Sequence, residues 1–161
     1  MSLDRIRLAS LHDKVISAEE ASAFIEDGMT VGMSGFTRAG EAKAVPLALV
    51  KRAHTNPLKI TLITGASLGN DLDKQLTEAG VLARRLPFQV DNTLRKAINN
   101  GEVMFIDQHL SETVEQMRNG QLKKTELAII EAVAITEAGG IIPTTSVGNS
   151  ASLVEFADQL I

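Results

Sequence analysis

Short apolar stretches alternate with longer amphipathic stretches along most of the chain, and this alternation predicts strands and helices in turn. Polar caps and glycines mark several helix ends. Ser17 with Glu20 three residues later has the pattern of a capping box, and Gly28 stands where that helix should end. Strands are predicted at 29–34, 58–64, 81–83, 103–106 and 126–130, a hairpin at 133–142, and helices at 17–27, 43–54, 70–79, 91–98, 108–118 and 149–159.

Strands that alternate with helices of about ten residues are typical of βαβ units. Parallel crossovers are right-handed, so we expect an α/β fold with a mostly parallel sheet and helices on both faces. A length of 161 residues suits one domain over 1–161. The last predicted helix carries the apolar pair Leu160 and Ile161 at the chain end, so we expect the natural polypeptide to continue beyond it.

The composition narrows the classes of function. A net charge of −4 and a pI of about 5.4 leave no basic excess for binding nucleic acid or an anionic membrane. The absence of cysteine excludes disulfides, thiolate catalysis and zinc–thiolate sites. The apolar run 127–135 is too short to cross a bilayer, and residues 1–11 lack the apolar core of a signal peptide. We therefore expect a cytoplasmic protein with no membrane partner and no metal site.

The first of three loops rich in glycine and hydroxyl residues lies at 35–40, between a predicted strand and a predicted helix. Ligands of open α/β sheets bind beyond the carboxyl ends of strands. Gly35 and Gly40 let backbone N–H groups face a ligand, and Arg38 adds a positive charge. Lys43 lies near the positive end of the next helix, where a bound anion would stabilise it. Anion binding and a plain solvated loop both fit this pattern, which matches neither the Walker loop nor GxGxxG.

Two further loops follow predicted strands. In the second, 64–70, Ser67 is a candidate hydrogen-bond donor to a substrate. Its surroundings match the GxSxG of serine hydrolases, but the only histidine that follows it is His109, so structural capping is favoured over a nucleophile. The third loop, 143–150, either contacts a ligand or caps the next helix through Ser146 or Asn149.

Isolated acidic residues give weaker signals. Glu131 lies inside an apolar run, which favours a paired structural carboxylate over a functional one. Asp107 and His109 have atoms of the metal-binding type but too few partners, so a helix cap by Asp107 is favoured.

Several runs, taken in order, resemble the acetyl-CoA hydrolase/transferase family, most closely its succinyl-CoA:acetate CoA-transferase branch. The resemblance extends over nearly the whole chain. The runs that carry it are MSGFT at 33–37, KAVP at 43–46, TGAS at 64–67, FIDQHL at 105–110, EAVAITE at 131–137 and PTTSVGNS at 143–150.

The resemblance implies that the chain is the N-terminal CoA-transferase domain, NagB-like in fold, of a longer enzyme with its active site between two similar domains. A glutamate of the second domain, which this chain lacks, would attack the acyl-CoA thioester. No catalytic residue is therefore expected within 1–161, and the chain alone should be inactive. The substrate- and CoA-binding residues implied are Gly35, Phe36, Thr37, Arg38, Gly40, Ser67 and Asn149.

The resemblance also implies partners. Coenzyme A would act as a co-substrate, with no bound cofactor, beside an acyl-CoA, a short carboxylic acid, the second domain and further copies of the chain. The stretch 87–90 would form another wall of the pocket. Some family members carry a hydroxyl residue where this chain has Val90, which leaves open whether the acid is acetate, succinate or propionate.

Other functions remain open at this point, because a fold alone does not fix an activity. The chain could belong to an acetyl-CoA hydrolase, to a non-catalytic domain that binds sugar phosphates, or to a serine hydrolase built on Ser67. Protection by acetate or acyl-CoA would favour the transferase, and protection by a sugar phosphate the binding domain. Loss of thioester hydrolysis in Ser67→Ala would favour the serine hydrolase.

Overall fold

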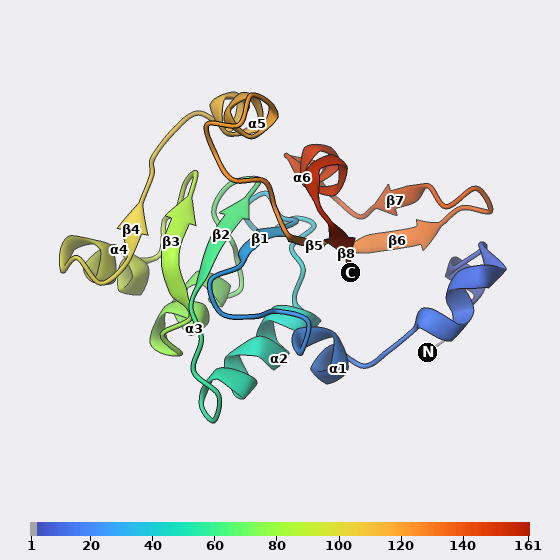
Figure 1. Ribbon diagram of the computed structural model, residues 1–161, viewed down its shortest axis with the longest axis horizontal. Helices are drawn as coiled ribbons and strands as arrows, with labels where there is room; N and C mark the ends of the chain where they lie inside the picture. Colours follow the sequence, from blue (N-terminus) through green and yellow to red (C-terminus); the bar gives the residue numbers. More distant parts are fainter. Residues whose placement is uncertain (1–2) are drawn as a thin grey trace.

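A six-stranded parallel sheet forms the centre of the molecule (Figure 1). The structure is a computed structural model and describes residues 3–161. The strands lie in the order β4-β3-β2-β1-β5-β8, and every pairing between them is parallel, which confirms the predicted α/β class. Their bounds are β1 (Thr30–Met33), β2 (Ile60–Thr64), β3 (Leu82–Leu86), β4 (Met104–Phe105), β5 (Leu127–Ile129) and β8 (Gln159–Leu160).

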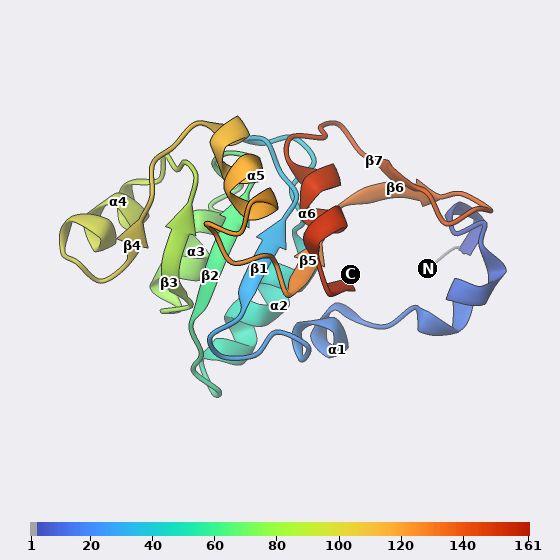
Figure 2. The ribbon, with the colours of Figure 1, turned by 45° about the horizontal axis from the view of Figure 1, so that its top comes forward.

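Helices cover both faces of this sheet, as Figures 1 and 2 show. One face carries α1 (Ala18–Ser22), α2 (Ala44–Ala53), α3 (Leu72–Glu78) and α4 (Asn92–Asn99), and the other carries α5 (Leu110–Arg118) and α6 (Ser150–Phe156). No helix among residues 3–161 combines the length and the apolar character that a membrane span requires.

Aliphatic side chains fill the space on both sides of the sheet. Successive residues of a strand point to opposite faces. Leu62 accordingly packs in the larger core with residues of α2, α3 and α4, whereas Ile63 packs with Met117 of α5 and Leu153 of α6. Burial of a side chain of this size contributes about 1.5–3 kcal/mol. The two cores thus fix the strands, and with them the loops at the strand ends.

A small antiparallel hairpin extends beside the sheet and confirms the predicted hairpin. It consists of β6 (Ala132–Ile135) and β7 (Ile141–Pro143). The N-terminal segment, with 3-10 turns at Leu3–Arg5 and Ala9–Lys14, reaches it through a hydrogen bond from the Arg7 amide to the Ile135 carbonyl.

The first helix begins as predicted but is shorter than 17–27. Its capping box is formed, because the Ser17 hydroxyl accepts from the Glu20 amide and the Glu20 carboxylate accepts from the Ser17 amide. Beyond Ser22 the backbone continues in tighter turns, since the Ile25 amide donates to the Ser22 carbonyl at 3.2 Å. Arg52 donates to the same carbonyl from α2.

The prediction of a helix over 149–159 is wrong at its C-terminal end. Helix α6 ends at Phe156, and Gln159–Leu160 form strand β8 instead. The free edge of β5 explains this outcome, since the amide of Ile161 donates to the carbonyl of Ala128 at 2.8 Å. Backbone groups left open at a sheet edge thus outweigh the amphipathic pattern of the last residues.

Candidate functional site

Three loops meet at the carboxyl edge of the sheet. The first loop (35–40) follows β1, the second loop (64–70) begins at the end of β2, and the third loop (143–150) connects β7 to α6. The amide of Thr37 donates to the carbonyl of Ser67 at 3.0 Å, which joins the first loop to the second. The hydroxyl of Ser146 donates to the carbonyl of Ala39 at 2.7 Å, which joins the third loop to the first.

The loops approach one another so closely that Gly65 has no room for a side chain. A Cβ atom at Gly65 would lie 2.6 Å from the carbonyl oxygen of Gly35 and 3.3 Å from the amide nitrogen of Asn149. Thr37 has a φ of 59°, a left-handed conformation that is rare for a residue with a β-branched side chain. Its hydrogen bond to Ser67 holds the loop in that conformation.

A buried carboxylate connects the end of the first loop to the second loop. Glu41 is fully buried, and its Oε2 atom accepts from the amide of Gly69 at 2.6 Å. Its other oxygen accepts from the side-chain amide of Asn70. Hydrogen bonds to an ionised group are stronger than neutral ones. Glu41 therefore stabilises the contact between the two loops.

The predicted anion near Lys43 is not needed, because the protein supplies the counter-charge itself. Lys43 is the N-cap residue of α2 and forms an ion pair with Glu131. Glu131 also accepts from the hydroxyl of Thr144 in the third loop, at 2.8 Å. Lys43 therefore gives no reason to expect a bound anion, whereas the prediction that Glu131 is a paired carboxylate is confirmed.

A pocket of about 290 Å³ lies between the first and second loops and the segment that follows β3. That segment contains a cis peptide bond between Leu86 and Pro87. Phe88 and Val90, both exposed, belong to the wall that the stretch 87–90 was expected to form. The pocket is lined by Thr37, Arg38, Ser67, Leu68, Gly69, Asn70, Asp71, Asp73, Phe88, Val90 and Asp91.

Ser67 combines burial with an unused hydroxyl group. The residue is 2% exposed and lines the pocket. Its carbonyl accepts from Thr37, but its hydroxyl has no hydrogen-bond partner among residues 3–161. Among residues 3–161 the buried side-chain atoms without a partner are Arg52 Nε and Gln89 Oε1, so the Ser67 hydroxyl oxygen remains accessible from the pocket. It is therefore free to bond a ligand there.

Arg38 supplies positive charge at the same place. Its side chain lines the pocket, is exposed, and forms no ion pair with any other residue in the described part of the chain. A guanidinium group presents N–H donors in a planar fork that matches a carboxylate. The pocket thus offers one neutral and one charged donor to an anion.

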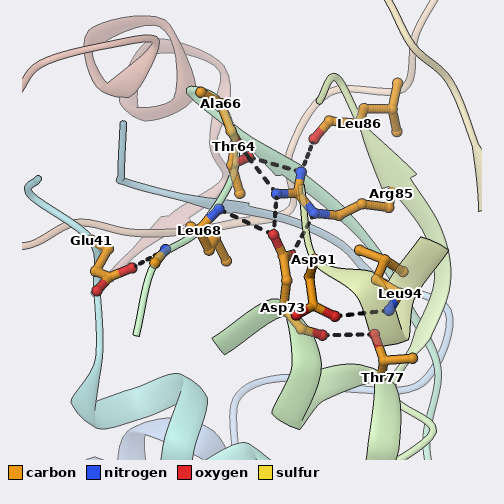
Figure 3. A network of polar contacts seen from close by, with 11 residues as sticks. Glu41, Thr64, Ala66, Leu68, Asp73, Thr77, Arg85, Leu86, Asp91 and Leu94 are labelled. Atoms are coloured by element: carbon orange, nitrogen blue, oxygen red, sulfur yellow. Dashed lines mark hydrogen bonds and ion pairs between the residues drawn. The ribbon is translucent and has the colours of Figure 1, made fainter. Parts of the chain in front are cut away.

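A buried ion pair lies beneath the second loop, and sequence reasoning missed it (Figure 3). Arg85 on β3 and Asp73 on α3 are 0% and 1% exposed in their side chains, with 2.9 Å between Nε and Oδ1. The sequence LARRL shows an arginine within an apolar strand, which is a signal for a buried charge, but nothing nearby identifies its partner.

Within residues 3–161, no histidine forms a hydrogen bond with the Ser67 hydroxyl, as a serine hydrolase would require. His109 is the N-cap of α5, where its Nδ1 atom pairs with the hydroxyl of Ser111 at 2.8 Å. A nucleophilic serine needs a base within hydrogen-bond reach. The prediction that Asp107 caps this helix is also wrong, because His109 stands at the capping position and accepts from the Ser111 amide.

The remaining predicted residues lie around the pocket rather than in its wall. Gly35 and Gly40 are buried behind the first loop, and Phe36 is 45% exposed beside it. Asn149 stands at the N-cap of α6 without a side-chain capping bond, and its amide donates to the Leu110 carbonyl at 3.3 Å. Asp71, which does line the pocket, likewise occupies the N-cap of α3 without a capping bond. The predicted set therefore divides into pocket residues Thr37, Arg38 and Ser67, and residues that shape the surrounding loops.

Comparison with protein families gives a match over residues 2–161 to the acetyl-CoA hydrolase/transferase N-terminal domain. The chain is 45% identical over 159 residues to the succinyl-CoA:acetate CoA-transferase of Clostridium kluyveri, which covers 98% of this chain and 30% of the relative. It is 36% identical over 151 residues to the propanoyl-CoA:succinate CoA transferase of Escherichia coli, covering 91% and 31%. It is 36% identical over 168 residues to the acetyl-CoA hydrolase of Saccharomyces cerevisiae, covering 98% and 32%.

Solved structures share the fold at low sequence identity. A variant of the decarboxylase AibA/AibB aligns with a TM-score of 0.66 and 16% identity, over 90% of this chain and 71% of that one. An acyl-CoA transferase from Escherichia coli, in a thioester complex with CoA, aligns with a TM-score of 0.61 and 12% identity, over 91% and 42%. At these identities the likeness shows a common architecture.

Proposed function

The chain belongs to the acetyl-CoA hydrolase/transferase family, and from this membership we propose that it forms the carboxylate-binding part of an enzyme that moves CoA between an acyl-CoA and a short carboxylic acid. Relatives are named as CoA-transferases and as acetyl-CoA hydrolases. The chain spans about a third of their length. We therefore assign to residues 1–161 one step of the reaction, which is binding of the acid.

The observation that carries the proposal is the free hydroxyl of Ser67, a residue of the pocket wall that is otherwise buried. A hydrogen bond to a charged group contributes about 1.5–3 kcal/mol. A carboxylate that enters the pocket accepts such a bond from this hydroxyl. Arg38 adds attraction for the negative charge of the acid, and the exposed side chains of Phe88 and Val90 offer an apolar surface for its carbon chain.

We place the carboxylate that attacks the thioester outside residues 1–161. The buried carboxylates around the pocket already have structural partners, since Asp73 binds Arg85 and Glu41 binds the second loop. Asp91 caps α4 by accepting from the Leu94 amide at 2.9 Å. Asp71, the remaining carboxylate of the wall, is exposed to water. The isolated chain should therefore bind the acid without turnover.

Titration with acetate, monitored by the amide resonances of the first and second loops, tests the proposal. Acetamide has the same shape without the charge and serves as the control ligand. We expect acetate to shift the Ser67 and Leu68 resonances and acetamide to leave them unchanged. Ser67→Ala should weaken acetate binding by about tenfold or more, the equivalent of one hydrogen bond to a charged group. Ser111→Ala, on the far helix α5, is the matched control. Equal affinities of Ser67→Ala and the unaltered chain would overturn the proposal.

Hydrolysis is the second candidate reaction, because the chain resembles yeast acetyl-CoA hydrolases as well as transferases. In a hydrolase water takes the place of the acid acceptor, so acetate binding would have no role as a substrate step. Incubation of the chain with acetyl-CoA and labelled acetate tests for both activities at once. We expect neither exchange of label nor release of acetate. Either activity in the isolated chain would contradict the placement of the attacking group elsewhere.

A further inference from the structure

One ion pair holds both peptide groups that flank Ser67. The Nη2 atom of Arg85 donates to the carbonyl of Ala66 at 3.1 Å, and this carbonyl belongs to the peptide group before Ser67. The Oδ2 atom of Asp73 accepts from the amide of Leu68 at 3.1 Å, and this amide belongs to the peptide group after Ser67. Because the two peptide planes determine the backbone angles of Ser67, they fix the direction of its Cα–Cβ bond, and the hydroxyl then occupies one of the few staggered rotamers about that bond.

The ion pair is itself rigidly held. The guanidinium and the carboxylate meet through two bonds, Nε to Oδ1 at 2.9 Å and Nη2 to Oδ2 at 3.2 Å. The remaining N–H groups of Arg85 donate to the hydroxyl of Thr64 at 2.8 Å and to the carbonyl of Leu86. Each N–H group of the guanidinium therefore has an acceptor, and two of these acceptors, on Thr64 and Ala66, belong to the segment that ends in Ser67 (Figure 3).

Stability alone does not require such a pair. A buried ion pair must overcome the loss of hydration of both charges, and apolar side chains of similar volume often stabilise a core equally well. Directional donors and acceptors provide what apolar packing cannot, which is a defined orientation of the backbone groups they bind. Here those groups are the neighbours of a pocket hydroxyl.

We propose that Asp73 and Arg85 are positioning residues, which hold the backbone of Ser67 so that its hydroxyl can donate to the bound carboxylate. This inference rests on the proposed function, since it assigns a purpose to the orientation of Ser67 in the pocket. In the protein without ligand, the pair should also protect the Leu68 amide from hydrogen exchange, because this amide donates to Asp73.

The test compares the whole chain with Asp73→Asn, which keeps the shape but has one acceptor oxygen where the carboxylate has two. An amide oxygen turned to Arg85 leaves an NH2 group facing the Leu68 amide, so this hydrogen bond breaks. We expect faster hydrogen exchange at Leu68, unchanged protection at Val31 in β1, and acetate binding weakened by about tenfold. Arg85→Lys, which keeps the charge but loses the planar fork, should show the same two effects and covers the case in which Asp73→Asn does not fold.

Leu49→Ala distinguishes positioning from general destabilisation. Leu49 is fully buried in α2, and its truncation should lower the melting temperature while leaving acetate affinity within about twofold, because its apolar side chain makes no hydrogen bond to the peptide groups around Ser67. A loss of affinity in Leu49→Ala as large as in Asp73→Asn would overturn the inference.

The exchange data separate this inference from the proposed function. If the unaltered chain does not bind acetate, the proposed function fails, and so does the purpose assigned to the pair. If acetate binds but Asp73→Asn keeps both its affinity and the protection of Leu68, the positioning inference alone is wrong.

Discussion

Replacement of Gly65 by alanine should disturb all three loops of the pocket at once. A Cβ atom at this position would lie 2.6 Å from the Gly35 carbonyl oxygen, well inside the 3.4 Å at which ordinary contact begins. The next nearest atoms, 3.3 and 3.5 Å away, belong to the backbone of Asn149 and Gly148. All three neighbours are backbone atoms, so no side-chain rotation can relieve the contact.

The expected loss of stability follows from this crowding. An extra methyl group in a closely packed region destabilises by about 1–3 kcal/mol when the backbone has to move. In a domain of this size 1 kcal/mol corresponds to about 2–4 °C in melting temperature, so Gly65→Ala should melt about 2–12 °C lower. The backbone shift should also reach the first and third loops.

Thermal unfolding and amide chemical shifts together check this prediction. Gly101→Ala is the control, because Gly101 has a φ of 76° and no atom within 4 Å of its missing Cβ. That change should destabilise by about 1–2 kcal/mol through backbone strain alone and shift only nearby amides. Gly65→Ala should in addition move the resonances of Phe36 and Asn149. Unchanged resonances there, or a loss of stability below about 0.5 kcal/mol, would refute the reasoning.

Three further changes probe other contacts. Ser34→Ala should destabilise by about 1–3 kcal/mol for each partner left unpaired, namely the Gly40 carbonyl and the Glu131 amide, as measured by urea unfolding. Asp91→Ala removes the cap of α4 and should lower stability by about 0.5–2 kcal/mol in the same measurement. Glu126 has its pKa lowered by the ammonium group of its lysine neighbour and by a backbone amide. Its stabilising effect is therefore present above the ordinary value of 4.5 and lost as pH falls below it, so Glu126→Gln should unfold with a weaker pH dependence in that range.

Elements set by local chemistry could be predicted from the sequence. The capping box at Ser17 and the cap at Asp91 depend on residues within one helical turn, and both are present. The meeting of the first and second loops followed from a general property of parallel sheets, whose carboxyl ends share one edge. The third loop follows the antiparallel hairpin, so this rule did not place it.

Features that depend on distant partners could not be predicted. Lys43 lies near the positive end of a helix, which suggested a bound anion. Its actual partner, Glu131, lies 88 residues further along the chain, so local sequence could not reveal the pair. The end of the last helix depended on the open edge of β5, which only the folded sheet reveals. The pairing of Arg85 with Asp73 likewise follows from the contact of a strand with a helix. Asp73 and Arg85, which bond the peptide groups beside Ser67, could therefore be identified only from the folded structure.

A crystal structure of the chain soaked in acetate tests the central claim most directly. We predict density for one acetate ion in the pocket between the first and second loops, with a carboxylate oxygen at about 2.5–3.0 Å from the Ser67 hydroxyl. Acetate bound elsewhere, or a Ser67 hydroxyl turned to an acceptor of the protein while the pocket holds only water, would contradict the account.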